Sequence, residues 1–335
     1  MPSFVLFDLL SVHTYRIMTI GCTLIGGLAG AMGALIYLRK RTLMSDVIGH
    51  SATTGVMLAF MIGSAIIGVD GRSLWLLVAG SVAIGTLAAV MADRIAHVTR
   101  VSIDAAMAIM LALFFGLGMV LLRIIERGNY RHRGGLKDYF FGNASTLTKA
   151  DVATIAVLCV VVALTFFAFY RGLSAHVFDV ITAEVRGFSA RLYGPLLLAM
   201  VSVAVVVGVK SVGLILMVAL AAIPPAAARQ WTRHLHTMII LSAIIGAVSA
   251  VLGSLISVSL GKIPTGPVIV LVLTAVLFIS LFAAPRRSVI VRAIARRKQH
   301  QVLLAAAKDE SLDAHEVTGK VLSDKEIAMA RGAHQ

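Results

Sequence analysis

Long apolar stretches recur along most of the chain, each about as long as one membrane crossing and separated from the next by a short polar segment. A membrane-spanning helix needs about 20 apolar residues, because hydrocarbon offers no hydrogen-bond partner to an exposed backbone. The pattern predicts nine helical segments, at residues 17–38, 43–68, 74–91, 105–125, 152–170, 192–209, 212–223, 238–260 and 268–283. We therefore expect an all-α polytopic membrane protein with about eight or nine transmembrane helices.

The seventh apolar segment, 212–223, is too short to cross a bilayer alone. Pro224 and Pro225 follow it directly, and a proline inside a helix lacks the N–H and clashes with the preceding turn. We therefore predict a broken or returning helix at this point, with its ends shielded by the rest of the bundle.

The connecting segments differ from one another in composition. Residues 126–149 contain glycines and aromatic side chains, which favours a partly structured re-entrant or surface helix. Residues 171–191 have the pattern of a short amphipathic helix at the membrane interface. We expect two regions, a transmembrane domain over residues 1–284 and a basic cytoplasmic C-terminal tail over residues 285–335.

Composition supports a membrane protein and excludes several functional classes. Hydrophobic residues make up 59% of the chain, charged residues 14%, and the mean hydropathy is +0.94, which exceeds what one water-soluble core needs. The net charge of +14 is spread along the chain, which favours loops at a lipid surface over a nucleic-acid-binding stripe. Cys22 and Cys159 lie in apolar stretches and are expected to be packing residues. With no Walker phosphate loop and no GxSxG elbow, we expect a transporter that is not an enzyme and has no tightly bound cofactor.

Three ionisable residues within or directly before the apolar segments are candidates for a cation site. An ionisable group at the centre of a spanning helix costs at least about 2.5 kcal/mol, so its presence suggests a function. Asp46 and His50 are four residues apart, on one face of a helix, and carboxylate with imidazole suits Mn, Fe or Zn. Asp104 follows Arg100 much as Asp46 follows Arg41, so we expect all three side chains to meet at a similar depth.

Each of these candidates has a structural alternative. Asp46 can simply orient the polar His50, and Asp104 can be the N-cap of the helix that follows. Asp93 and His97 have the same spacing as Asp46 and His50, but they lie beside two arginines in a loop-like stretch. A solvated ion pair is the preferred interpretation there.

Five motifs, in order, resemble the permease subunits of ABC importers for manganese, zinc and iron. They are YLRKRTLMSDVIGHSATTGVMLAF, SIDAAMAIMLALFFGLGMVLL, GLKDYFFGNASTLTKADV, AHVFDVITAEVRGFSARL, and a run from VGLILMVALAAIPPAAARQWTRHLHT to IPTGPVIVL. Asp46, His50 and Asp104 stand at matching positions. Thr54 stands where the family usually has proline, and Ser45 where it usually has glycine.

The resemblance implies a helical bundle like that of type II ABC importers, with the N-terminus outside and the C-terminus inside the bacterial plasma membrane. Lysine and arginine counts alone divide evenly between the two sides and do not fix this orientation. It further implies that Asp46, His50 and Asp104 hold the transported cation. A coupling segment would contact the ATPase, with these candidate residues: Ala226, Ala227, Ala228, Arg229, Thr232 and Arg233.

The implied function is that of a permease subunit of an ATP-driven divalent metal importer, with manganese favoured over zinc or iron. The implied partners are a cytoplasmic ATPase dimer, an extracytoplasmic metal-binding protein, a second permease copy or paralogue, and the lipid bilayer, with no nucleic acid. The alternative from the residues alone is a stand-alone, proton-coupled secondary transporter in which Asp46 and Asp104 carry protons.

Overall fold

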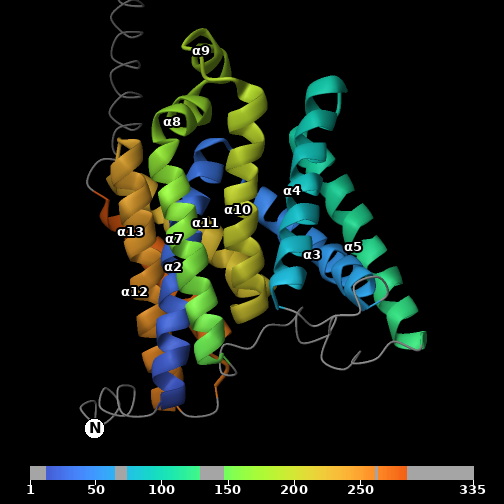
Figure 1. The fold of residues 1–335 in the computed structure, drawn as a ribbon. Coiled ribbons are helices and arrows are strands. Elements are labelled where there is room, and N and C mark those ends of the chain that lie inside the picture. Colours follow the sequence, from blue (N-terminus) through green and yellow to red (C-terminus); the bar gives the residue numbers. More distant parts are fainter. Residues whose placement is uncertain (1–12, 65–73, 129–146, 261–262, 285–335) are drawn as a thin grey trace, which may run out of the picture. The chain divides into compact units, whose positions relative to one another are not determined.

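The computed structural model describes residues 13–64, 74–128, 147–260 and 263–284. The predictions for residues 129–146 and for the tail after Ala284 lie outside this part of the chain. Residues up to Ser280 form one compact unit and the remainder a second, and the bundle described below belongs to the first (Figure 1). The helices are α2 (His13–Leu38), α3 (Met44–Ile62), α4 (Leu74–Val98), α5 (Ile103–Arg127), α7 (Lys149–Ala168), α8 (Tyr170–Phe178), α9 (Val180–Val185), α10 (Ala190–Val212), α11 (Leu214–Trp231), α12 (Leu235–Leu260) and α13 (Thr265–Ala283).

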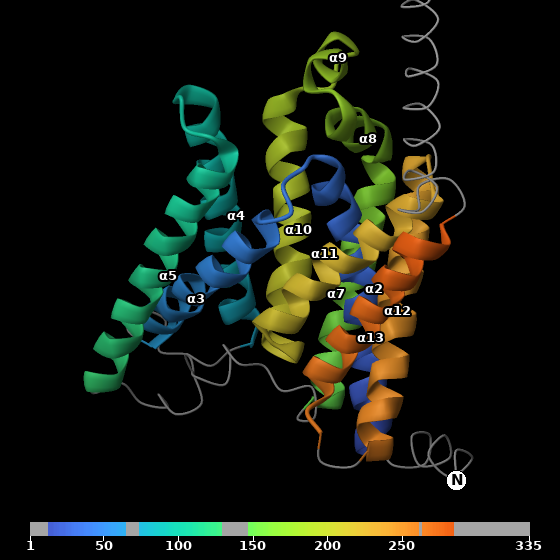
Figure 2. The same ribbon diagram turned by 180° about the vertical axis from the view of Figure 1, so that it is seen from behind.

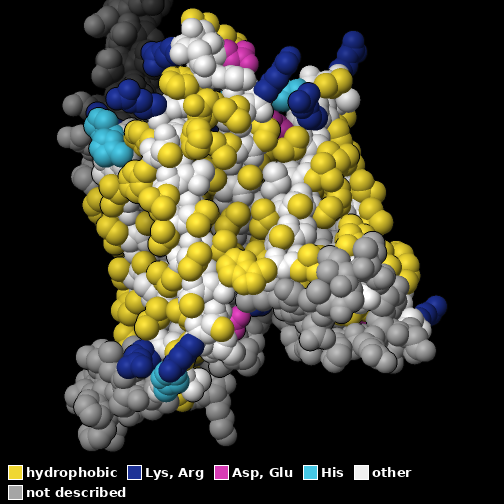
Figure 3. All heavy atoms as spheres, in the orientation of Figure 1, with side chains coloured by type: hydrophobic (Ala, Val, Ile, Leu, Met, Phe, Trp, Pro, Cys, Tyr) yellow, Lys and Arg dark blue, Asp and Glu magenta, His cyan; other side chains and the backbone are white. Residues whose placement is uncertain are grey.

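A helix occurs at each of the nine predicted segments, and eight helices of the described residues are long and apolar enough to cross a membrane. The exception is α3, whose polar residues lower its hydropathy and most of whose residues are buried in the bundle. On the face shown in Figure 3, hydrophobic side chains cover the middle, and lysine and arginine side chains lie at the two ends. This distribution fits a bundle that crosses a bilayer.

The predicted break at the double proline is wrong. Helix α11 continues through Pro224 and Pro225 to Trp231, over 18 residues, and qualifies as a spanning helix. The two prolines remove only the N–H groups that would bond the carbonyls of Leu220 and Ala221. The carbonyl of Ala221 lies against the backbone of Gly33 on α2, where any side chain would clash with it. Packing against α2 thus supports the helix where its own hydrogen bonds are missing.

Two groups of helices pack through close backbone contacts. In the first, α2 meets α12, where a Cβ atom on Gly26 would stand 2.6 Å from the carbonyl oxygen of Gly246, and the Ser242 hydroxyl donates to the Gly30 carbonyl over 2.6 Å. In the second, α3 meets α4, where Gly55 and Gly80 are in similar backbone contact. Small residues of this kind let membrane helices approach closely. Helix α10 lies between the two groups in both ribbon views (Figure 2) and contacts α2, α3, α4 and α11.

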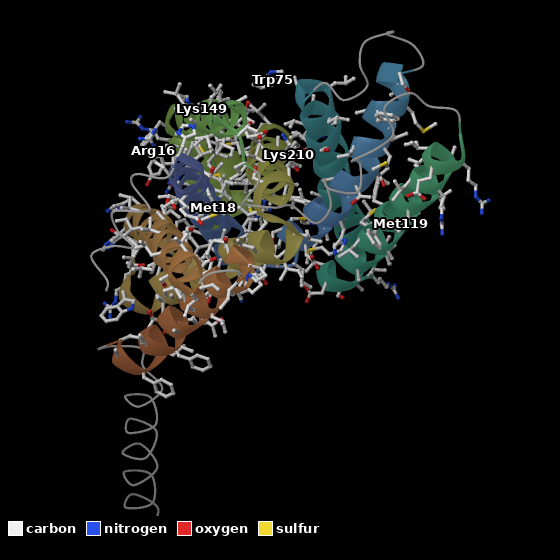
Figure 4. The ribbon with its side chains drawn as sticks, turned by 90° about the horizontal axis from the view of Figure 1, so that it is seen from below. Arg16, Met18, Trp75, Met119, Lys149 and Lys210 are labelled. Atoms are coloured by element: carbon white, nitrogen blue, oxygen red, sulfur yellow. The ribbon has the colours of Figure 1, made fainter. Side chains whose placement is uncertain are left out.

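Ion pairs and caps fix the ends of the helices. At one end, the ammonium of Lys210 on α10 lies 2.8 Å from the carboxylate of Asp151 on α7, and the same carboxylate completes a capping box with Thr148. Figure 4 looks onto this end, where Lys149 and Lys210 lie on neighbouring helices. Where one short helix is predicted, over residues 171–191, the chain forms two short helices, α8 and α9, and the Asp179 carboxylate caps α9 by accepting from the Ile181 N–H.

Candidate metal centre

Helix α3 places Asp46 and His50 side by side. The helix begins at Met44, so Asp46 lies in its first turn and His50 one turn later on the same face. The Nε2 atom of His50 lies 3.5 Å from the Oδ1 atom of Asp46, and both side chains are partly buried, at 25% and 32% exposure. A carboxylate oxygen and an imidazole nitrogen at this separation can share one divalent cation.

The structure does not bring Asp104 to this pair. Within the part of the chain that it describes, no group of three or more His, Cys, Asp or Glu side chains could hold a metal ion. Helices α3 and α5 run in the same direction, since His50 contacts Phe115 and the later α3 residues cluster with Leu122 and Ile125. Asp104 precedes Phe115 by eleven residues, and Asp46 precedes His50 by four, which leaves about 10 Å between the two carboxylates along the helix axes.

The expectation of equal depth for the two carboxylates fails because α3 begins deeper in the bundle than α5 does (Figure 1). Asp104 is also not the N-cap of α5. Ser102 holds that position, and its hydroxyl accepts from the Ala105 N–H over 3.3 Å. Asp104 is exposed in the first turn, where a negative charge interacts favourably with the helix dipole.

The turn before α3 carries a charged network that the sequence pattern only partly indicated. Lys40 has a positive φ of 57°, and the Arg41 N–H bonds back to the Ile36 carbonyl over 3.1 Å, which is the Schellman arrangement at the end of α2. Arg41 then pairs with Asp93 on α4. Asp93 also lies 3.8 Å from the exposed His97, so the two side chains are close as predicted, although they lie on a continuous helix and Asp93 is only partly solvated, at 22% exposure.

His176 is a buried histidine that sequence analysis did not single out. It lies on α8 with 4% of its surface exposed, and neither ring nitrogen has a hydrogen-bond partner among the described residues. Burial, together with the nearby charges of Arg39 and Arg41, lowers the pKa of His176 from 6.5 to about 4, and Asp93 opposes this shift. Burial also lowers the pKa of Arg39, to about 10. The packed form of α8 therefore requires a neutral imidazole.

Acidification should loosen the packing of α8. A released His176 would take up a proton below pH 6.5, whereas the packed one resists protonation until about pH 4, so stability is complete above pH 6.5 and falls between these values. At pH 5 we expect a loss of about 1–2 kcal/mol, measured as a fall in the unfolding temperature of the purified protein relative to pH 7.5. His176→Leu should lose less over the same range. The control His236→Leu, at an exposed histidine, should behave as the wild type. Equal losses in all three proteins would contradict this assignment.

The predicted coupling segment is divided between α11 and the turn that follows it. Ala227, Ala228 and Thr232 are buried within the chain, whereas Ala226 and Arg229 are partly accessible and Arg233 is exposed. The Thr232 hydroxyl donates to the Ala228 carbonyl over 3.0 Å and ends the helix. Of the six predicted residues, these three with accessible side chains are the ones that can meet a partner.

The two cysteines have the packing role expected of them. Both are free. Cys22 is fully buried and Cys159 partly buried in the bundle.

Comparison with known proteins places the chain in a family. The sequence profile of the ABC 3 transport family matches residues 13–284. The chain belongs to the ABC 3 transport family. It is 34% identical over 293 residues to the zinc transport system membrane protein TroC of Treponema pallidum, covering 88% of this chain and 96% of TroC. It is also 34% identical over 291 residues to the manganese transport system membrane protein MntC of Bacillus subtilis, covering 85% of this chain and 66% of MntC.

A solved structure supports the same assignment. PsaBC from Streptococcus pneumoniae, in complex with Fab, matches with a TM-score of 0.72 at 30% identity, covering 86% of this chain and 98% of the matched chain. As an ABC 3 transport family member, the chain is a multi-pass permease of the bacterial plasma membrane. The expected all-α bundle of the ABC importer type is thereby confirmed.

Proposed function

We propose that this ABC 3 transport protein is the permease subunit of an ATP-driven importer of a divalent metal cation, with manganese as the preferred substrate. The single observation that carries the proposal is the Asp46–His50 pair, a carboxylate and an imidazole 3.5 Å apart on a helix packed inside a membrane bundle. Relatives whose names specify zinc or manganese transport support a first-row divalent cation.

The pair is suited to transient binding of a cation. One carboxylate neutralises half of a 2+ charge, and a neutral imidazole adds a nitrogen ligand without adding charge. Two protein ligands leave most of the coordination sphere to water, so the affinity should be modest, as a translocation step requires. We assign Asp104, about 10 Å along the axes, to a second transient contact on the path, outside this coordination sphere.

The proposed assembly consists of two permease copies or paralogues, a cytoplasmic ATPase dimer and an extracytoplasmic metal-binding protein, with the N-terminus outside and the C-terminus inside. The turn between α11 and α12 is the proposed contact with the ATPase. Arg229 and Arg233 supply positive charge there, which can pair with carboxylates across the contact. Ala227 and Ala228, buried under this surface, serve its close packing.

Reconstitution with a cognate ATPase and binding protein tests the function. We expect manganese to accumulate in proteoliposomes only when ATP is hydrolysed, and an imposed proton gradient without ATP to have no effect. Arg233→Glu should lower ATP-driven uptake about tenfold while the protein still folds, because the exposed side chain would repel an acidic partner surface. Arg16→Glu, at an exposed residue near the start of α2, is the matched control. Uptake driven by the proton gradient alone would instead favour a secondary transporter.

A further inference from the structure

Helix α5 is fixed against α3 by a hydrogen bond from a side chain that is unusual for the resembled motif. Thr54 stands where that motif has proline, and its side chain is buried, at 2% exposure. Its hydroxyl donates to the carbonyl of Phe114 on α5. Gly118, one turn further along α5, leaves room for this approach, since a Cβ atom there would stand 3.0 Å from the Thr54 hydroxyl oxygen and 2.5 Å from a methyl carbon of Thr53. A side chain larger than glycine would push the two helices apart.

Phe115, the residue after the Phe114 acceptor, contacts the candidate metal ligand His50. The ring of Phe115 meets the imidazole of His50 edge-on, with ring centroids 4.9 Å apart and an interplanar angle of 80°. The Thr54 hydroxyl donates to the carbonyl of Phe114, which directly precedes Phe115. The register that this bond sets between α3 and α5 therefore also sets the position of the Phe115 ring. Asp46, His50 and Thr54 follow one another at four-residue spacing, so all three lie along the same side of α3.

The Nδ1 side of the His50 ring has no hydrogen-bond partner among the described residues. Its Nε2 atom faces Asp46 at 3.5 Å, whereas its Nδ1 atom is buried. A histidine that binds metal is ordinarily oriented by a hydrogen bond at its other nitrogen. Here the aromatic contact with Phe115 takes that place.

We propose that Thr54 and Phe115 are positioning residues for the metal site: the Thr54 hydroxyl holds α5 in register, and the Phe115 edge then holds His50 with Nε2 toward Asp46. The inference rests on the proposed function, since it assigns a role only if His50 binds the cation. It identifies α5 as the element through which a helix movement would alter the affinity of the site, without itself contributing a ligand there.

The test is a titration of the purified full-length protein in lipid nanodiscs with manganese, in which the electron paramagnetic resonance signal of free Mn²⁺ reports the dissociation constant. We expect Thr54→Val, which removes the hydroxyl and keeps the shape, to weaken binding about three- to tenfold. Phe115→Leu should weaken binding by a similar factor. Thr54→Ser, which restores the hydroxyl, should stay within about twofold of the wild type.

A double variant and a matched control separate positioning from general damage. Thr54→Val combined with Phe115→Leu should bind no worse than Phe115→Leu alone, because both changes remove one linked constraint and residues that act together are not additive. Thr53→Val makes the same chemical change one residue away and should bind as the wild type. Unfolding temperatures measured in parallel show whether a variant is merely destabilised, and Phe115→Leu decides the outcome if Thr54→Val does not fold.

The outcomes distinguish the inference from the function on which it rests. If His50→Ala loses manganese binding but Thr54→Val and Phe115→Leu keep the wild-type dissociation constant, the positioning role is overturned and the metal site stands. If His50→Ala itself binds manganese as the wild type does, the proposed site is wrong and the inference is overturned with it. Additive losses in the double variant would also overturn it, since the two residues would then act independently.

Discussion

Asp46→Ala and His50→Ala should each lower metal uptake about 100-fold or more while the protein remains folded. Removing the carboxylate leaves a 2+ ion without a neutralising charge in a medium where unpaired charge is costly. Removing the imidazole takes away the nitrogen ligand of the proposed pair, and even changes to residues that support metal ligands commonly cost 10–100-fold. The measurement is uptake of manganese, zinc and iron, each assayed separately, in cells that carry the variant as their sole copy of this permease.

The chain offers a close control for this experiment. Asp93 and His97 on α4 have the same four-residue spacing as Asp46 and His50, but His97 is 68% exposed. His97→Ala should leave uptake within about twofold of the wild type. Asp104→Asn should have an intermediate effect, because it removes the proposed second contact of the cation and neither member of the Asp46–His50 pair. If His50→Ala and His97→Ala behave alike, the Asp46–His50 pair is not the metal site.

Gly246→Val should prevent the bundle from folding. A Cβ atom at this position would overlap the backbone of Gly26 on α2, and no rotamer change can relieve a clash with backbone. The two helices would have to separate along their contact, with loss of the Ser242–Gly30 hydrogen bond and of the buried packing around it. We expect little or no monodisperse protein, a loss of several kcal/mol, measured by size-exclusion chromatography of detergent-solubilised membranes.

Gly116→Ala is the matched control for this substitution. A Cβ atom at Gly116 on α5 would meet nothing within 4 Å, and alanine favours a helix interior over glycine by about 1 kcal/mol. The control should therefore be at least as stable as the wild type. Normal yield and behaviour of Gly246→Val would contradict the backbone contact between α2 and α12.

The sequence was a good guide to the helices because the length of an apolar stretch is set by the bilayer. It was a poorer guide where backbone packing decides the outcome. Pro224 and Pro225 disfavour a helix in isolation, but in the bundle the Ala221 carbonyl, which loses its N–H donor, packs against Gly33. The rotation of α2 about its axis decides which of its glycines meets a given residue of another helix. An almost uniformly apolar segment has no hydrophobic periodicity from which this rotation could be predicted.

The candidate site was predictable in its local part only. Asp46 and His50 are one turn apart, so helix geometry alone brings them together. The position of Asp104 depends on how far α5 is shifted along α3. The similar spacing of Asp46 and Asp104 from the arginines before them predicts equal depth, and this prediction is wrong. In the sequence, Thr54 is only a departure from the family pattern, because its hydrogen bond to the Phe114 carbonyl depends on how α3 and α5 pack.

The two kinds of helix contact in the bundle differ in how easily they can slide. Within each helix group, Gly26 meets Gly246 and Gly55 meets Gly80 through backbone atoms. Backbone atoms cannot change rotamer, so these helices cannot slide past one another without separating. Where α3 faces α10 and α11, by contrast, Gly49 meets the tips of Leu214 and Val209, and such side chains can change rotamer as surfaces shear past one another. The contact of α3 with α10 and α11 is therefore the one along which the two helix groups can move most easily. We expect a shear movement there to expose a cation bound at His50 while the contacts within each helix group stay intact.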